Sequence, residues 1–199
     1  SQPDGDLPRS VPDRFGVASG GSVAAGVSPV AASDRPRSDS RFFGRALESD
    51  AMRVVENTMD VPIETLLERP LFCFLASVDD GLPRVSPLWY LWEDGTVWIM
   101  ADREKTYVSR VEATPEAALA VVEFLPGSGV VRHVGFRGQA SVEPFDLDRA
   151  NRLLQRYLGP DPESWDERFL PPWSDRWCFI RLAPETVVAR DQSYDVGIA

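Results

Sequence analysis

The chain has 199 residues, of which 43% are hydrophobic and 26% are charged, and its formal net charge is −10. This length and composition are typical of one globular domain with an appendage, and they exclude a fibrous chain or two independent catalytic domains. The acidic balance argues against binding nucleic acid or an anionic membrane through the overall electric field.

Residues 1–50 differ in composition from the rest of the chain, because Gly, Ser, Ala, Pro and Asp dominate them. The uncharged stretch from Phe15 to Ser33 is interrupted by Gly, Ser and Pro, so it does not predict a transmembrane helix. No basic region precedes a Leu-rich core, so a secretory signal is not predicted either. We expect a flexible or partner-wrapping N-terminal arm over residues 1–50 and a folded domain over residues 51–199.

A short helix and three strands are predicted first in the folded part. The spacing predicts a helix over residues 63–70 that ends at a proline. Apolar and β-branched runs predict strands over residues 71–78, 82–92 and 96–101. The Asp-Gly pairs at 80–81 and 94–95 are typical of hairpin turns. Cys73 and Cys178 lie in apolar runs, as expected for core residues of a reduced, cytoplasmic protein.

The second half of the chain continues with longer strands and further helices. A helix is expected after the third strand, and if Asp102 is its N-cap, Arg103 and Lys105 lie in its first turn. Strands are predicted over residues 117–125, 130–142, 177–182 and 185–191, and helices over residues 147–157 and 161–169. In the strand over 130–142, one face carries Val130, Val134, Phe136, Ala140 and Val142, and the other carries His133, Arg137, Gln139 and Ser141. Such strands predict a mainly β protein, a small antiparallel barrel with accessory helices.

Arg103 and Lys105 lie where the chain passes from the third strand into the next helix, and Lys105 is the only lysine among the 21 basic residues. A helix N-terminus carries partial positive charge, so cations there are unfavourable unless an anion such as a phosphate binds the exposed N–H groups. Alternatively, Asp102 and Glu104 compensate the charge locally and both cations point to water. The charges alone leave both interpretations open.

The second strand can add to such a site. Arg84, Ser86 and Leu88 share one of its faces and can present polar groups to a phosphate or a ribityl chain. Trp89, Trp92 and Trp98 offer flat apolar surface for an aromatic ring, or they belong to the core or to a dimer interface.

Several short motifs follow one another in a fixed order. They are Gly81-x-Pro83-x-x-Ser86, then Arg103-x-Lys105-Thr106, then Gly135-Phe-Arg-Gly-Gln-Ala140, helices with Tyr157 and Trp165, and Asp175-Arg176 before a strand that ends in Leu182-Ala-Pro184. In order and spacing the chain resembles the pyridoxamine 5′-phosphate oxidase-like split-barrel family. The resemblance covers about residues 60–192 and leaves the N-terminal arm out.

This resemblance implies a six-stranded antiparallel split β-barrel that forms a homodimer, with a flavin or deazaflavin bound at each of two sites between protomers. The implied cofactor-binding residues are Arg84, Ser86, Pro87, Leu88, Met100, Ala101, Arg103, Lys105, Thr106, Arg176 and Trp177. Among them, Arg103 and Lys105 would hold the cofactor phosphate. Ser86, Pro87 and Leu88 would line the path of the ring and ribityl chain. Met100 and Ala101 would contact the cofactor by backbone, and Arg176 and Trp177 are candidates to reach across the dimer.

The Arg-x-Lys-Thr string is more similar to the family branch that binds the deazaflavin coenzyme F-420 than to the FMN oxidases. Coenzyme F-420 is therefore the favoured cofactor and FMN the alternative. Vitamin B6 oxidation is disfavoured, because the oxidase Arg-Leu-His signature is missing. Haem is disfavoured, because the single histidine, His133, lies in mid-strand, where a structural role is expected. The resemblance implies an oxidoreductase that transfers a hydride to or from a small conjugated substrate such as an enone or quinone.

No side chain is predicted to be catalytic, because the sequence offers no convincing nucleophilic triad or metal ligand set, and cofactor chemistry requires neither. Two alternatives remain. One is a non-catalytic split barrel that binds a cofactor or another protein, and the other is a β-barrel without any cofactor. The expected partners are a second copy of the chain and a small molecule, with neither nucleic acid nor membrane.

Overall fold

An eight-stranded, largely antiparallel sheet organises residues 52–197, the part of the chain that the computed structural model describes. The strands are β1 (Arg53–Asn57), β2 (Cys73–Asp79), β3 (Leu82–Leu88), β4 (Leu91–Glu93), β5 (Thr96–Asp102), β6 (Glu116–Leu125), β7 (Val130–Pro144) and β8 (Trp177–Asp191). The helices are α1 (Ile63–Leu67), α2 (Thr106–Ala113) and α3 (Leu147–Leu158), with 3-10 turns at Pro162–Ser164 and Glu167–Phe169. The expected arm over residues 1–50 lies outside the described residues.

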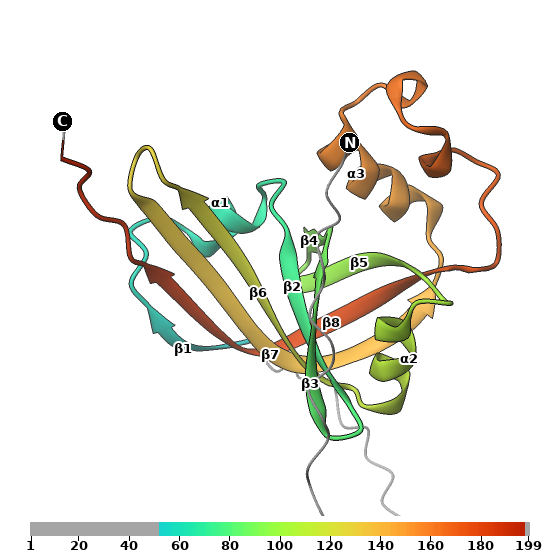
Figure 1. The fold of residues 1–199 in the computed structure, drawn as a ribbon, viewed down its shortest axis with the longest axis horizontal. Coiled ribbons are helices and arrows are strands. Elements are labelled where there is room, and N and C mark those ends of the chain that lie inside the picture. Colours follow the sequence, from blue (N-terminus) through green and yellow to red (C-terminus); the bar gives the residue numbers. More distant parts are fainter. Residues whose placement is uncertain (1–51, 198–199) are drawn as a thin grey trace, which may run out of the picture. The chain divides into compact units, whose positions relative to one another are not determined.

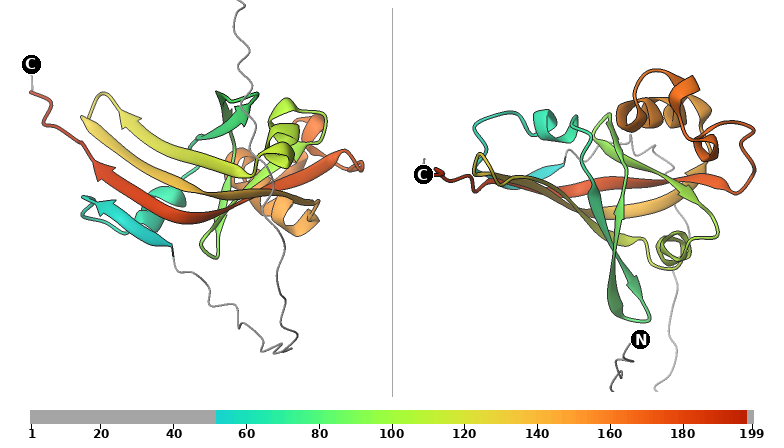
Figure 2. Two further views of the ribbon diagram at one scale, coloured as in Figure 1. Left: turned by 90° about the horizontal axis from the view of Figure 1, so that it is seen from below. Right: turned by 45° about the horizontal axis from the view of Figure 1, so that its top comes forward.

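The strand order is β3-β2-β6-β7-β8-β5-β4, and β1 pairs in parallel with β8. The first half of β8 pairs with β5 and its second half with β1, while β7 runs along its other side. The curved sheet and its helices are visible in Figure 1 and, from two further sides, in Figure 2. The mainly β, antiparallel prediction is confirmed, with eight strands instead of six. No helix within residues 52–197 is long and apolar enough to cross a membrane.

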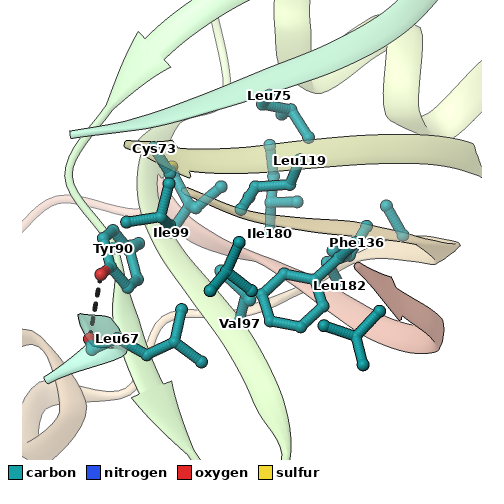
Figure 3. Packing of buried hydrophobic residues seen from close by; sticks show 14 of the residues in the cluster. Leu67, Cys73, Leu75, Tyr90, Val97, Ile99, Leu119, Phe136, Ile180 and Leu182 are labelled. Atoms are coloured by element: carbon teal, nitrogen blue, oxygen red, sulfur yellow. Dashed lines mark hydrogen bonds between the residues drawn. The ribbon is translucent and has the colours of Figure 1, made fainter. Parts of the chain in front are cut away.

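Two apolar clusters hold the domain together. The larger one lies between the inner face of the sheet and helices α1 and α2, and Figure 3 shows its centre around Leu75, Ile99 and Phe136. The smaller one packs Leu153 and Leu154 of α3 against Phe179 of β8. Burying a large aliphatic or aromatic side chain contributes about 1.5–3 kcal/mol, so these clusters supply the main stabilising term. The alternation predicted for β7 is confirmed at its centre, where Val134, Phe136 and Ala140 are buried.

The predicted strand over residues 82–92 is interrupted at Trp89 and Tyr90, and the reason is a tertiary contact. The Tyr157 hydroxyl of α3 lies 3.1 Å from the Tyr90 backbone nitrogen, whose N–H donates to it, and 3.2 Å from the Tyr90 carbonyl. The single O–H of Tyr157 has a shorter acceptor in the Leu71 carbonyl, at 2.7 Å, so the bond from the Tyr90 N–H is the one that replaces strand pairing at that point. Tyr90 itself is buried, and its hydroxyl donates to the Leu67 carbonyl at 2.9 Å (Figure 3).

Other boundaries also differ from the prediction for identifiable reasons. The two strands expected over 177–182 and 185–191 form the single strand β8, because an irregular register opposite Gly138 accommodates Pro184. The helix expected over 161–169 is two 3-10 turns, each begun by an aspartate side chain that accepts a backbone N–H, from Asp161 and Asp166. Strand β1 was not predicted, since its pairing partner β8 is distant in sequence. Both Asp-Gly turns are confirmed, with positive φ at each residue.

Candidate anion-binding site

The link between β5 and α2 is shaped by Asp102. One carboxylate oxygen accepts the backbone N–H of Glu104 at 3.0 Å, and the other pairs with the Arg176 guanidinium, which also donates from Nε at 3.1 Å. These bonds lower the pKa of Asp102, the bond from Arg176 being the larger cause. The Arg103 backbone N–H donates to the Arg176 carbonyl at 2.8 Å, which fixes the end of β5 to the start of β8.

Asp102 is therefore not the N-cap of the next helix, which corrects the sequence prediction. Helix α2 begins at Thr106, and Lys105 occupies the N-cap position without any side-chain capping bond. The physical reason is that the Asp102 carboxylate is already used in the turn and the ion pair. Arg103 and Lys105 thus precede the helix and do not lie inside its first turn.

The N-terminus of α2 is consequently electropositive. Its first turn contains no acidic residue, and no side chain caps it. Arg103 and Lys105 are exposed beside it, and neither forms an ion pair with another residue in 52–197. Asp102 forms its ion pair with Arg176 instead of with Arg103 or Lys105. Free helix N–H groups with unpaired cations are the features that bind a phosphate group.

Arg110, which the sequence analysis missed, gathers residues of three elements. Its Nε donates to Ser77 Oγ of β2 at 2.9 Å, Nη1 donates to Thr106 Oγ1 of α2 at 3.0 Å, and Nη2 donates to Ser86 Oγ of β3 at 3.4 Å. Ser86 and Thr106, both predicted site residues, are thereby brought together. The spacing of four residues between Thr106 and Arg110 on a helix was the one available signal.

The remaining predicted residues are spread around this region. Arg84 pairs with Asp79 at 3.3 Å in the hairpin, and Pro87 is exposed on the edge strand β3. Leu88 packs against the larger apolar cluster, whereas Met100 packs against the smaller one. In register, Met100 pairs with Phe179, Ala101 with Cys178 and Asp102 with Trp177. Arg176, a candidate to reach across a dimer, pairs with Asp102 of its own chain.

The aromatic residues considered for ring stacking have partners within the chain. Trp89 stacks on Tyr157 with ring centroids 4.8 Å apart, and Trp92 stacks on Phe136 at 5.3 Å. The Arg149 guanidinium lies 3.6 Å from the centre of the Trp98 ring. One face of each of these rings is therefore occupied, as the core interpretation predicts.

The outer face of the sheet carries apolar side chains beside charged ones such as Arg137 and Arg190, and no element among residues 52–197 covers it. Phe74 is 39% exposed, Val85 63% and Val55 53%. Together with small residues such as Ala120 and Gly135, they line an open groove of about 550 Å³ across β1, β8, β7, β6, β2 and β3. His133 lies on this face and also lines the groove.

The described residues offer little side-chain chemistry. Burial raises the pKa of the Cys73 thiol to about 12 and also raises that of Cys178, so neither is an activated nucleophile. Within residues 52–197, no group of three or more His, Cys, Asp or Glu side chains is arranged to hold a metal ion.

Comparison with known proteins agrees with this geometry. Residues 59–190 match the family described as pyridoxamine 5′-phosphate oxidase, which is most of the chain. No curated protein sequence matches the chain.

Solved structures show the same fold at low sequence identity. A conserved hypothetical protein from Mycobacterium tuberculosis superimposes with a TM-score of 0.55 at 17% identity, covering 74% of this chain and 98% of that one. A FAD-binding protein from Mesorhizobium loti gives 0.51 at 20% identity, with 65% and 92% covered. The heme storage protein HutZ from Vibrio cholerae gives 0.52 at 18% identity, with 66% and 93% covered. The match over residues 59–190, on a sheet shared with these proteins, establishes that the chain belongs to the pyridoxamine 5′-phosphate oxidase family of split barrels.

Proposed function

We propose that the chain is an oxidoreductase that binds coenzyme F-420, or alternatively FMN, and transfers a hydride to or from a small conjugated substrate. The observation that carries this proposal is the uncapped N-terminus of α2 beside Arg103 and Lys105, two exposed cations that form no ion pair within residues 52–197. This arrangement fits the phosphate that both cofactors carry. When bound, the cofactor supplies the hydride chemistry itself.

The chain's own residues would bind and orient this group. Arg103 and Lys105 would hold the phosphate, together with the free N–H groups of α2 and the Thr106 hydroxyl. Ser86, Pro87 and Leu88 on β3 would line the path toward the ring, and the β5 backbone at Met100 and Ala101 would contact it. Arg176, held by Asp102, fixes the start of β8 beside this path. The protein would then raise the rate of hydride transfer by orienting the substrate against the cofactor ring and by excluding water.

A homodimer is part of the proposal, because the outer sheet face needs a partner. A two-residue turn joins β2 and β3, and it sets which pairs of residues are hydrogen-bonded. The backbone groups of Arg84, Ser86 and Leu88 bond to β2. Those of Pro83, Val85 and Pro87 point away from β2, toward the free edge of the sheet. Proline has no N–H, so this edge can hardly accept another strand. A partner is therefore expected on the face, where a second copy can pack the same exposed side chains, Val55, Phe74 and Val85, against it.

This dimer has a direct test in solution. Light scattering at micromolar concentration should give twice the 22.1 kDa mass of the chain. Val85→Glu, which places a charge on the face, should shift the protein to the monomer. Leu147→Glu is the matched control, since Leu147 is 50% exposed on α3 and should leave the dimer intact. A monomeric wild-type protein would contradict a site shared between protomers.

Lys105→Ala tests the phosphate site. The substitution should weaken binding of the cofactor by about 1–3 kcal/mol, because a charge-assisted hydrogen bond is lost. Fluorescence titration measures the change. Arg168→Ala, which removes an exposed cation that pairs with Asp166, is the control for net charge and should change nothing. Equal affinity of Lys105→Ala and wild type would contradict a phosphate site at Lys105, whereas a β-barrel without any cofactor predicts that neither protein binds the cofactor.

Turnover separates the enzyme from the non-catalytic alternative. Reduced cofactor bound to the protein should be oxidised faster when enones or quinones are added, and this oxidation is followed by absorbance. If the protein binds the cofactor but no acceptor changes the oxidation rate, the chain is a cofactor carrier.

A further inference from the structure

Arg110 differs from most arginines of this domain in its partners. Its three hydrogen bonds to described residues all go to hydroxyl oxygens, and it forms no ion pair with any residue in 52–197. By contrast, Arg176, Arg132 and Arg190 each pair with a carboxylate. A partly buried guanidinium held only by neutral groups keeps its positive charge uncompensated.

The donor–acceptor direction of these bonds determines which further hydrogen bonds the three hydroxyls can form. A guanidinium has only donors, so Ser77, Ser86 and Thr106 must accept from Arg110. Each hydroxyl keeps one O–H group to donate, and none of the three donates a hydrogen bond to another described residue. Ser77 is 3% exposed, so bulk water has little access to its hydroxyl. The cluster therefore presents three O–H donors beside an uncompensated positive charge.

Two grooves reach this cluster. Ser77 lines one of about 350 Å³ together with Pro83 and Gln139. Arg110 lines another of about 410 Å³, which Asp79 and Asp80 also border. Glu116 and Glu185 border the first groove, and Ser86 and Thr106 line neither groove. Because carboxylates disfavour an anion in both grooves, an anionic ligand is expected outside them, on the side of Ser86 and Thr106.

We propose that Ser86, Thr106 and Arg110 form a donor set that recognises the phosphate oxygens of the cofactor, and that Arg110 fixes the direction in which the two hydroxyls donate. This inference rests on the proposed function and adds a residue to it. Arg110 acts through its own remaining N–H groups and through the hydroxyls that it orients. A lysine cannot replace it, because one ammonium cannot bridge three hydroxyls on β2, β3 and α2 in a fixed plane.

The test compares ligands with and without phosphate on the full chain. FMN, riboflavin, coenzyme F-420 and inorganic pyrophosphate are titrated against wild type, Arg110→Gln, Arg110→Lys and Arg168→Gln. Arg110→Gln should weaken binding of each phosphate-bearing ligand by about 10- to 100-fold, and Arg110→Lys by about 10-fold. Riboflavin binding should change less than about twofold, since it lacks the phosphate. Arg168→Gln carries the same charge change at an exposed position and should behave as wild type.

The outcomes separate this inference from the proposed function. If wild type binds FMN or F-420 and Arg110→Gln binds it equally well, the role of Arg110 is overturned and the proposed function stands. If wild type binds only pyrophosphate and Arg110→Gln loses that binding, the donor set is supported and the proposed cofactors are contradicted. Binding of no phosphate-bearing ligand by wild type overturns both. If Arg110→Gln does not fold, Ser86→Ala and Thr106→Ala carry the test, each with an expected loss of about three- to tenfold.

Discussion

Gly138→Ala should unfold the domain or lower its free energy of unfolding by more than about 3 kcal/mol. A Cβ atom at Gly138 would overlap the carbonyl oxygen of Ala183 and would lie 3.0 Å from the Glu185 backbone nitrogen. Both are backbone atoms of β8, which β5 and β7 hold from either side, so they cannot move independently. The irregular register that accommodates Pro184 in β8 thus requires a glycine at the paired position of β7, which is Gly138.

Urea unfolding followed by circular dichroism measures this effect. Gly127→Ala is the matched control, because Gly127 lies in the turn between β6 and β7 and a Cβ there meets no atom within 4 Å. The control should stay within about 0.5 kcal/mol of wild type. A Gly138→Ala protein as stable as this control would show that β8 can shift along β7 without cost.

Arg69→Met should lower the free energy of unfolding by about 2–4 kcal/mol, since it leaves a buried carboxylate without its nearest cation. Glu123 of β6 is 1% exposed and pairs with Arg69, while the next cation, Arg132, lies 3.9 Å away. The side chain of Arg69 is 45% exposed. Removing Arg69 therefore leaves a buried carboxylate, whereas removing Glu123 leaves a partly exposed guanidinium.

A double-mutant cycle tests that asymmetry. Glu123→Gln leaves cations that can reach water and should cost about 1 kcal/mol, less than Arg69→Met. Adding Glu123→Gln to Arg69→Met should restore part of the lost stability, because no buried charge remains. An Arg69→Met protein within about 0.5 kcal/mol of wild type would mean that Glu123 is stabilised by other groups.

Much of the fold follows from local patterns. The Asp-Gly turns, the alternation in β7 and the Asp146 cap of α3, whose carboxylate accepts the Arg149 N–H at 2.9 Å, are all local features. The boundaries that were wrong depend on distant partners. Tyr157 interrupts the strand at Tyr90, and no local pattern near residue 90 indicates it.

The site shows the same division. Arg103 and Lys105 were predicted as site residues because they lie next to an expected helix start, and Thr106 was predicted from the family motif. The helix start itself was misplaced, since Asp102 is taken by Arg176, which lies far along the chain. Arg110 was missed because its partners Ser77 and Ser86 belong to a hairpin that only the folded sheet brings beside α2. The burial of Glu123 was equally hidden, because Arg69 and Arg132 come from other elements.

The most direct test of the central claim is an absorbance and fluorescence titration of the purified chain with coenzyme F-420 and, separately, with FMN. We expect saturable binding of one of them, with F-420 favoured, at dissociation constants below about 100 μM, or roughly −5.5 kcal/mol. Such binding would justify a screen of enone and quinone acceptors. If neither cofactor binds below that concentration, the family fold stands and the proposed oxidoreductase activity is contradicted.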